Sequence, residues 1–136
     1  MACLFCEIIA GKSPAYFVYE DETYVAIMDK YPIHKGHTLV IPREHHEKIL
    51  DMSTESVATL FSKALPIARG VIEATSADGF NIGQNNGRAA NQIIPHVHVH
   101  IIPRYNDIAG WPKRTIADDK ELEELASKIR KCIKLD

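Results

Sequence analysis

Residues 96–102 read His-Val-His-Val-His-Ile-Ile, and this stretch decides both the expected fold class and the expected chemistry. Side chains alternate across a β-strand, so a strand over residues 95–102 would place the three imidazoles on one face, about 6.5–7 Å apart. The residues between them would face the core, and Pro103 would end the strand. Three imidazoles on one face need partners for their ring nitrogens. The pattern therefore favours a functional face, either metal-binding or nucleophilic, over ordinary core packing.

The remaining sequence predicts an α+β fold in a single domain, residues 1–136. Ser53 is a suitable N-cap for a long central helix, which Pro66 is expected to kink. A short helix is expected at residues 3–10 and a C-terminal helix from about Asp118. Five strands joined by short polar turns would form an antiparallel five-stranded sheet packed on these helices. The expected strands cover residues 15–20, 23–29, 37–41, 79–84 and 95–102.

Composition limits the functional classes. The chain has 136 residues, of which 46% are hydrophobic, and a formal net charge of −2. This charge gives no general attraction to nucleic acids or anionic membranes, so we expect neither as a partner. No apolar run approaches the roughly 20 residues that span a bilayer, and the N-terminus lacks the pattern of a signal peptide. We therefore expect a cytoplasmic protein.

The loop that precedes the histidine strand, Asn85-Asn86-Gly87-Arg88-Ala89-Ala90-Asn91-Gln92, is rich in neutral hydrogen-bond donors. Amide groups and free backbone N–H groups bind phosphoryl oxygens well. A loop Arg is more often solvated, although Arg88 would add positive charge beside a phosphate. An Asn-Asn-Gly turn is common and by itself indicates little. Because this turn lies one short loop before three alternating histidines, it indicates a site for a phosphate.

The three cysteines do not form a disulfide framework, because their number is odd and two of them are close together. Cys3 and Cys6 are a candidate metal or redox pair, and a zinc ion would need two further ligands. Cys132 belongs to an apolar helical pattern, so we expect it in the core.

Three motifs together resemble the histidine-triad superfamily. They are the histidine stretch followed by Pro103-Arg104, the segment Gly-His-Thr-Leu-Val-Ile-Pro-Arg at residues 36–43, and the opening Cys-Leu-Phe-Cys-Glu-Ile-Ile-Ala-Gly-Lys at residues 3–12. They occur in the order and spacing of that family and cover residues 3 to about 105. The opening resembles the histidine-triad nucleotide-binding branch, in its zinc-containing bacterial and archaeal type.

The resemblance implies that His98 is a nucleophile whose Nε2 attacks the α-phosphorus of a nucleotide conjugate. A transient nucleotidyl-histidine would form and water would then cleave it. The main-chain carbonyl of His96 would hold the proton on the other ring nitrogen of His98. His100 would lie near the leaving group or a non-bridging oxygen, as a donor or proton carrier, and His37 would support the triad as a fourth histidine.

The resemblance also implies a binding site for the rest of the nucleotide. Asn85 would contact the phosphate and Asp29 would accept hydrogen bonds from the ribose hydroxyls. Some relatives carry a hydroxyl residue where this chain has Ile93. Without that donor, either the rate is lower or a backbone N–H or Gln92 replaces it, and the preferred leaving group stays open. Five apolar residues match positions around the base, although ordinary core packing is the alternative for each: Leu4, Phe5, Ile8, Ile27 and Leu39.

Similar proteins complete a structural zinc site with the histidine after the Ile-Pro-Arg strand and the first triad histidine. Here these residues are His45 and His96, which with Cys3 and Cys6 would form a closed tetrahedral site. His46 is the rival to His45. We expect whichever of the two does not bind zinc, and also His34, to be solvated.

The predicted function is a nucleotide hydrolase that releases a nucleoside monophosphate, AMP or GMP, from phosphoramidate-type conjugates of a purine nucleotide. Dinucleoside polyphosphate hydrolysis and a non-catalytic zinc- or nucleotide-binding module are the alternatives. A nucleotidyl transferase is disfavoured by His100, because that branch typically has glutamine there. The resemblance also implies a homodimer. Trp111 would lie at the interface, at a neighbour's substrate site or over its own core.

Overall fold

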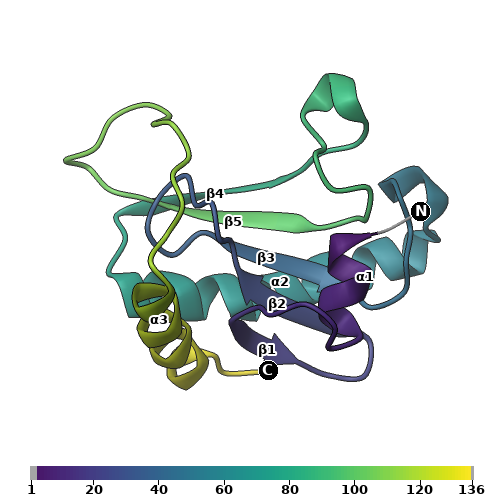
Figure 1. Cartoon of the computed structure of the whole chain (residues 1–136), viewed down its shortest axis with the longest axis horizontal. Helices are drawn as coiled ribbons and strands as arrows, with labels where there is room; N and C mark the ends of the chain where they lie inside the picture. Colours follow the sequence, from purple (N-terminus) through teal and green to yellow (C-terminus); the bar gives the residue numbers. More distant parts are fainter. Residues whose placement is uncertain (1–2, 136) are drawn as a thin grey trace.

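The computed structural model describes residues 3–135 and contains one antiparallel sheet with the strand order β1-β2-β3-β5-β4 (Figure 1). This confirms the predicted α+β class with a five-stranded sheet and three α-helices. The strands are β1 (Phe17–Glu20), β2 (Tyr24–Met28), β3 (Thr38–Pro42), β4 (Gly79–Gln84) and β5 (Val99–Arg104). The helices are α1 (Leu4–Ile9), α2 (Thr54–Thr75) and α3 (Asp119–Cys132), with short 3-10 turns at Ile49–Asp51 and Arg88–Ala90.

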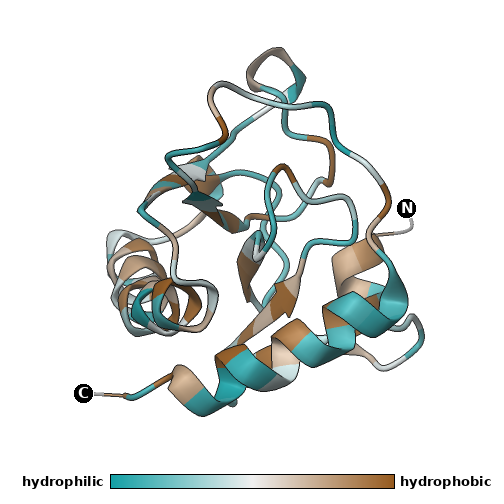
Figure 2. Cartoon of the chain, turned by 90° about the vertical axis from the view of Figure 1, so that its left-hand side faces the viewer, coloured by the Kyte–Doolittle hydropathy of each residue, from teal (hydrophilic) through white to brown (hydrophobic). Residues whose placement is uncertain are grey.

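The two sides of the sheet are covered differently. Helices α2 and α3 lie against one side and share the larger apolar core, which includes Ala26, Val40, Val99 and Ile101. Helix α1 covers the other side with a smaller cluster that includes Ile27 and Leu39. Every residue of β2 and β3 is buried because both sides of these strands are covered. In Figure 2, hydrophobic and hydrophilic residues alternate along the helix that leads to the C-terminus, as expected for a helix with one side on the core.

The helix boundaries agree closely with the sequence, because side-chain caps fix them. The Ser53 hydroxyl accepts a hydrogen bond from Ser56 N (3.1 Å), and Asp118 caps α3 in the same way from Glu121 N (3.3 Å). Helix α2 continues through Pro66 without a break. Helix α3 approaches α2 closely at Gly70, where an added Cβ would lie 2.6 Å from Ile133 Cγ1.

The histidine strand begins and ends later than predicted. Strand β5 starts at Val99 because the backbone N–H of Val97 donates to His46 O (2.8 Å), in a loop rather than in the sheet. The strand also continues through Pro103 to Arg104, so the predicted end is wrong. Beyond Ile101, β5 pairs only with β4, and a proline is tolerated where one side of a strand is unpaired.

Some apolar side chains remain exposed on the α2 side of the molecule. Phe80 and Ile82 on the edge strand β4 are 44% and 46% exposed. Phe61 and Leu65 on α2 are also exposed. At 100° per residue, both lie on the flank of α2 opposite Gly70 and therefore away from α3. Among residues 3–135, no helix is both long and apolar enough to cross a membrane.

Candidate active site and metal centre

The imidazole of His96 is fixed by a main-chain carbonyl. Its Nε2 lies 2.7 Å from Pro42 O, and a carbonyl oxygen can only accept, so this nitrogen carries the proton. The lone pair is therefore on Nδ1, which faces Cys3 Sγ (3.5 Å), Cys6 Sγ (3.6 Å) and His45 Nδ1 (3.1 Å). His96 is fully buried. Its free nitrogen is thus directed into a cluster of possible metal ligands.

The tautomer of His98 is fixed in the opposite sense. Its Nδ1 donates to the main-chain oxygen of His96 at 2.7 Å, which leaves the lone pair on Nε2. The edge of the Phe5 ring packs against this imidazole, with ring centroids 4.9 Å apart. A buried imidazole with its lone pair on an oriented Nε2 is suited to nucleophilic attack.

A backbone donor fixes the tautomers of the next two histidines. The N–H of Ile33 donates to His37 Nδ1 at 3.0 Å, so His37 carries its proton on Nε2. That proton is donated to His100 Nδ1 at 2.9 Å. Neutral His100 therefore keeps its own proton on Nε2. His98 and His100 thus offer complementary atoms, an acceptor on one ring and a donor on the other.

Burial favours the neutral form of all four histidines. Desolvation lowers the pKa of His37 to about 4 and that of His100 to about 3. It also lowers the pKa of His96 and His98, partly opposed at each by a hydrogen bond to a main-chain carbonyl. The Nε2 lone pair of His98 is consequently free at neutral pH.

Asp29 is buried beside these histidines, and one of its partners was not predicted from the sequence. Its Oδ1 accepts from Tyr31 N at 2.8 Å, and its Oδ2 lies 3.5 Å from His37 Nε2. Arg114 Nη1 donates to the same Oδ2 at 3.0 Å. Arg114 lies 85 residues away in the sequence, in a segment without regular secondary structure. No local motif marked it.

The loop at residues 85–92 uses its amides unequally. Gln92 is buried, accepts from Gly87 N at 2.7 Å and donates both amide hydrogens, to Glu47 O and Ile94 O. Gln92 therefore has no amide hydrogen left to bind a phosphate. Its hydrogen bonds instead stabilise the conformation of the loop. Asn86 similarly binds Ile49 N and Gln84. Within residues 3–135, the side chain of Asn85 has no hydrogen-bond partner, so its amide remains available.

The predicted base-pocket residues separate into two groups. Phe5, Ile8, Ile27 and Leu39 are buried together on the α1 side of the sheet, which also carries His100, the register partner of Leu39. Leu4 is 45% exposed and lies outside that cluster. Phe5 and Leu39 lie next to triad histidines, and Ile8 and Ile27 belong to the same buried cluster, whereas Leu4 lies outside it.

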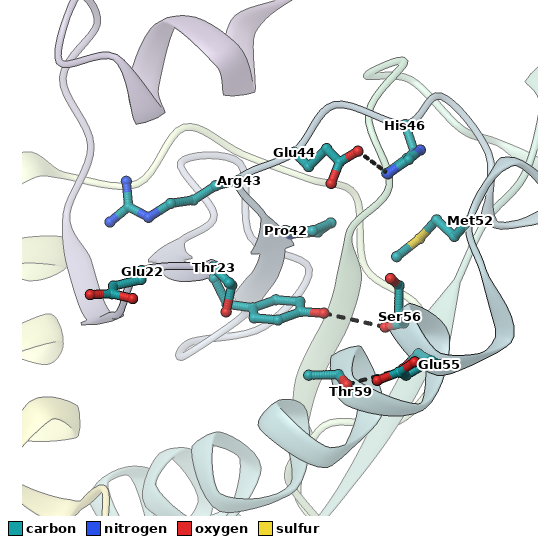
Figure 3. Close-up of a pocket in the computed structure, with 11 residues that line it drawn as sticks. Glu22, Thr23, Pro42, Arg43, Glu44, His46, Met52, Glu55, Ser56 and Thr59 are labelled. Atoms are coloured by element: carbon teal, nitrogen blue, oxygen red, sulfur yellow. Dashed lines mark hydrogen bonds and ion pairs between the residues drawn. The ribbon is translucent and has the colours of Figure 1, made fainter.

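The four predicted zinc ligands come together. The candidate ligand atoms of Cys3, Cys6, His45 and His96 all lie within 4.8 Å of one another. Two thiols and two imidazoles suit tetrahedral zinc. The backbone orients the cysteines, because Cys3 is the N-cap of α1 and its sulfur accepts from Cys6 N. The His46 side chain points away from these four ligands, toward a pocket at the start of α2. There its Nε2 lies 3.3 Å from Glu44 Oε1 (Figure 3).

A second group of possible ligands is better explained by hydrogen bonding. Atoms of Asp29, His37 and His100 also lie within 4.8 Å of one another. A metal there would have to bind His37 at Nε2. The N–H of Ile33 occupies Nδ1 and so keeps the ring proton on Nε2.

Three other residues differ from expectation or clarify it. His34, which we expected to be solvated, is only 5% exposed and packs edge-on against Tyr105. The turn at Gly36 brings this segment against Thr75 and Pro103, which explains the burial.

Trp111 is 62% exposed and lies against the Arg104 guanidinium, so it does not cover the core. Cys132 is half-buried and packs against the larger core.

Comparison with known proteins places this site in a family. The family model of the HIT domain matches residues 10–107. The adenosine 5'-monophosphoramidase hnt1 of Schizosaccharomyces pombe is 41% identical over 137 residues, covering 96% of this chain and 100% of that protein. The adenylylsulfatase HINT3 of Arabidopsis thaliana is 38% identical over 95% of this chain and 68% of its own length. The chain belongs to the HIT domain family.

Solved structures agree with this assignment. A histidine triad nucleotide-binding protein from Sulfolobus tokodaii superposes with a TM-score of 0.89 at 40% identity, covering 96% of this chain and 91% of that one. A Zn-bound histidine triad family protein from Mycobacterium smegmatis has a TM-score of 0.87 at 39% identity, covering 98% and 94%.

Proposed function

We propose that this HIT protein hydrolyses nucleoside 5'-phosphoramidates and related conjugates, releasing a purine nucleoside monophosphate. The observation that carries the proposal is the fixed tautomer of His98, whose Nδ1 proton is held by His96 O at 2.7 Å. The names of the relatives in Schizosaccharomyces pombe and Arabidopsis thaliana, a monophosphoramidase and an adenylylsulfatase, support the same bond class.

The reaction follows from the two ring tautomers. His98 Nε2 attacks the α-phosphorus, and the bond from phosphorus to the leaving amine breaks as the bond to nitrogen forms. The Nε2–H of neutral His100 donates a hydrogen bond to the leaving nitrogen, which takes its proton from water as the amine departs. Water then attacks the nucleotidyl-histidine, loses a proton to the solvent and releases the nucleoside monophosphate, which returns His98 to its neutral form. Asn85 binds a phosphate oxygen and Asp29 the ribose hydroxyls, while Phe5, Ile8, Ile27 and Leu39 border the base.

The test measures, by chromatography, the release of AMP from adenosine 5'-phosphoramidate. His98→Ala should lower kcat at least about 1,000-fold, as expected when a nucleophile is removed. His46→Ala is the matched control, because it removes a histidine directed away from the cluster, and it should keep activity. AMP binding and circular dichroism check the fold of each variant. Unchanged activity in His98→Ala would refute the nucleophile, and AMP binding without turnover of any conjugate would favour a binding module.

In the same assay, guanosine 5'-phosphoramidate tests the base preference, and adenylylsulfate and diadenosine polyphosphate test the leaving group. All of these substrates react at the α-phosphorus, but only the phosphoramidates have a leaving nitrogen that must gain a proton. Ile93 is 76% exposed on the loop before the triad and offers no side-chain donor. We therefore expect amine leaving groups, to which the Nε2–H of His100 can donate a hydrogen bond, to be preferred over diadenosine polyphosphate.

We propose further that Cys3, Cys6, His45 and His96 hold a structural zinc ion. Four protein ligands would leave no open position for substrate. The free Nδ1 of His96 supports this set, as does the Zn-bound relative from Mycobacterium smegmatis. Elemental analysis should find about one zinc per chain in the wild type and in Cys132→Ser, but little in Cys6→Ser. Equal zinc in all three proteins would refute the assignment.

Thiol ligands also suit the reducing cytoplasm, where we propose that the protein acts.

We also propose a homodimer formed through the exposed apolar flank of β4 and α2. An edge strand with exposed apolar residues readily pairs with another chain. Light scattering after size-exclusion chromatography should give a dimer for the wild type and a monomer for Ile82→Glu. Leu50→Glu changes a residue that is 89% exposed elsewhere and should remain dimeric. A monomeric wild type would refute the proposal.

A further inference from the structure

The segment of residues 105–117, here called the strap, connects β5 to α3 and returns to the end of β2 (Figure 1). At its start, Arg104 donates to Gly110 O and lies 4.5 Å from the Trp111 ring. At its end, Ala117 N donates to Lys30 O at 2.9 Å. Between these anchors, Arg114 Nη1 donates to Asp29 Oδ2 (3.0 Å) and Tyr31 O (3.2 Å). The strap is therefore tied to the residues that follow β2.

Few other contacts hold the strap in place. All residues from 106 to 116 are exposed, so this part buries little apolar surface. Segments with few buried contacts open at low free-energy cost. The Arg114 side chain is itself 36% exposed, and such ion pairs contribute little stability. The contact with Asp29 is strong enough to bias the position of the strap but weak enough to break.

The partner of Arg114 is also the group proposed to bind ribose. The Asp29 side chain is only 9% exposed, with one oxygen receiving Tyr31 N and the other receiving Arg114. Ribose hydroxyls would have to reach the same carboxylate. Because so little of this carboxylate is accessible, the guanidinium and the hydroxyls compete for it.

We propose that Arg114 is a latch that holds the strap over Asp29 and must release this carboxylate before a nucleoside can bind. The proposal rests on the proposed function of the site. If only a fraction of the protein molecules has the conformation that can bind the ligand, the apparent Kd equals the intrinsic Kd divided by that fraction. Removing the latch should therefore strengthen nucleoside binding, by about two- to fivefold for one partly exposed ion pair.

The experiment compares Arg114→Ala with Lys113→Ala by calorimetry. Lys113 is an exposed cation on the same strap, so its variant has the same net charge. The probes are AMP, adenosine and 2',3'-dideoxyadenosine, which lacks both ribose hydroxyls. We expect Arg114→Ala to lower the Kd of AMP and adenosine about two- to fivefold and to leave that of dideoxyadenosine unchanged. Lys113→Ala should bind all three like the wild type.

Each other result overturns the latch. Weaker AMP binding with unchanged adenosine binding would make Arg114 a phosphate ligand. Tighter binding of dideoxyadenosine as well would show that the strap obstructs the whole pocket instead of competing for Asp29. Normal AMP binding by the wild type without a gain in Arg114→Ala would overturn the latch alone. Failure of the wild type to bind AMP would overturn the proposed function together with the latch.

Discussion

The buried histidines predict a specific loss of stability in acid. In the unfolded chain His37 titrates near its ordinary pKa of 6.5, whereas burial lowers its pKa in the folded protein to about 4. Between these values the unfolded state binds more protons, so the free energy of unfolding falls as the pH decreases. The stabilising effect of neutral His37 is complete above pH 6.5 and is lost progressively on going down to pH 4.

The magnitude follows from the same two values. Integrating the proton difference from pH 7.5 to pH 4.5 gives a loss of about 2.5 kcal/mol for His37 alone. His37→Gln removes this titration and keeps an amide that can donate to His100. His37 and His100 share a hydrogen bond, so the pKa of His100 also changes in the variant and the two contributions are not independent. The absolute stability of His37→Gln will differ from that of the wild type, and the pH slope is the decisive quantity.

The assay is urea unfolding at pH 7.5, 6.5, 5.5 and 4.5, with zinc in excess throughout. The wild type should lose about 2.5 kcal/mol more than His37→Gln over this range. Protonation of His96 affects both proteins alike, so it cancels in the comparison. His46→Gln controls for the loss of one histidine in a partly exposed position. Parallel curves for the wild type and His37→Gln would refute the assignment of the acid loss to His37.

Three further predictions concern the helix packing, the loop and a helix cap. Gly70→Ala should destabilise the protein by about 1 kcal/mol, because the contact with Ile133 outweighs the gain in helix propensity, and a raised Tm would contradict this. Gln92→Ala should lower kcat for the phosphoramidate more than tenfold, since Gly87 N loses its acceptor and the loop that carries Asn85 loosens; unchanged kinetics would assign the loop's shape to other contacts. Asp118→Ala should cost about 1 kcal/mol in urea unfolding through loss of the α3 cap, with Asp119→Ala as the neighbouring control.

The sequence predicted most of the fold because its signals are local. The caps at Ser53 and Asp118 and the apolar patterns set each helix to within a residue or two. The start of β5 was missed, since periodicity cannot show that Val97 bonds to the backbone of His46. The burial of His34 was missed for a similar reason, because it depends on a turn packing against α2 and β5.

The site was predicted unevenly. Alternation and resemblance identified the histidines and brought Cys3 and Cys6 together with His45, because these motifs are compact in sequence. The proton positions on His96 and His98 depend on Pro42 O and His96 O, which no side-chain pattern reveals. Arg114 was not predicted, because its contact with Asp29 joins distant segments through an irregular part of the chain.

His96 contributes to two neighbouring groups of side chains through different atoms. Its imidazole faces the proposed metal ligands, and its carbonyl oxygen holds the Nδ1 proton of His98. Any amino acid at this position supplies the carbonyl, whereas only a few supply the metal ligand. An evolutionary lineage can therefore lose the ion and exchange this side chain while keeping the acceptor that holds the proton of the second triad histidine. We therefore expect metal content to vary among relatives more readily than the main-chain acceptor of the second triad histidine.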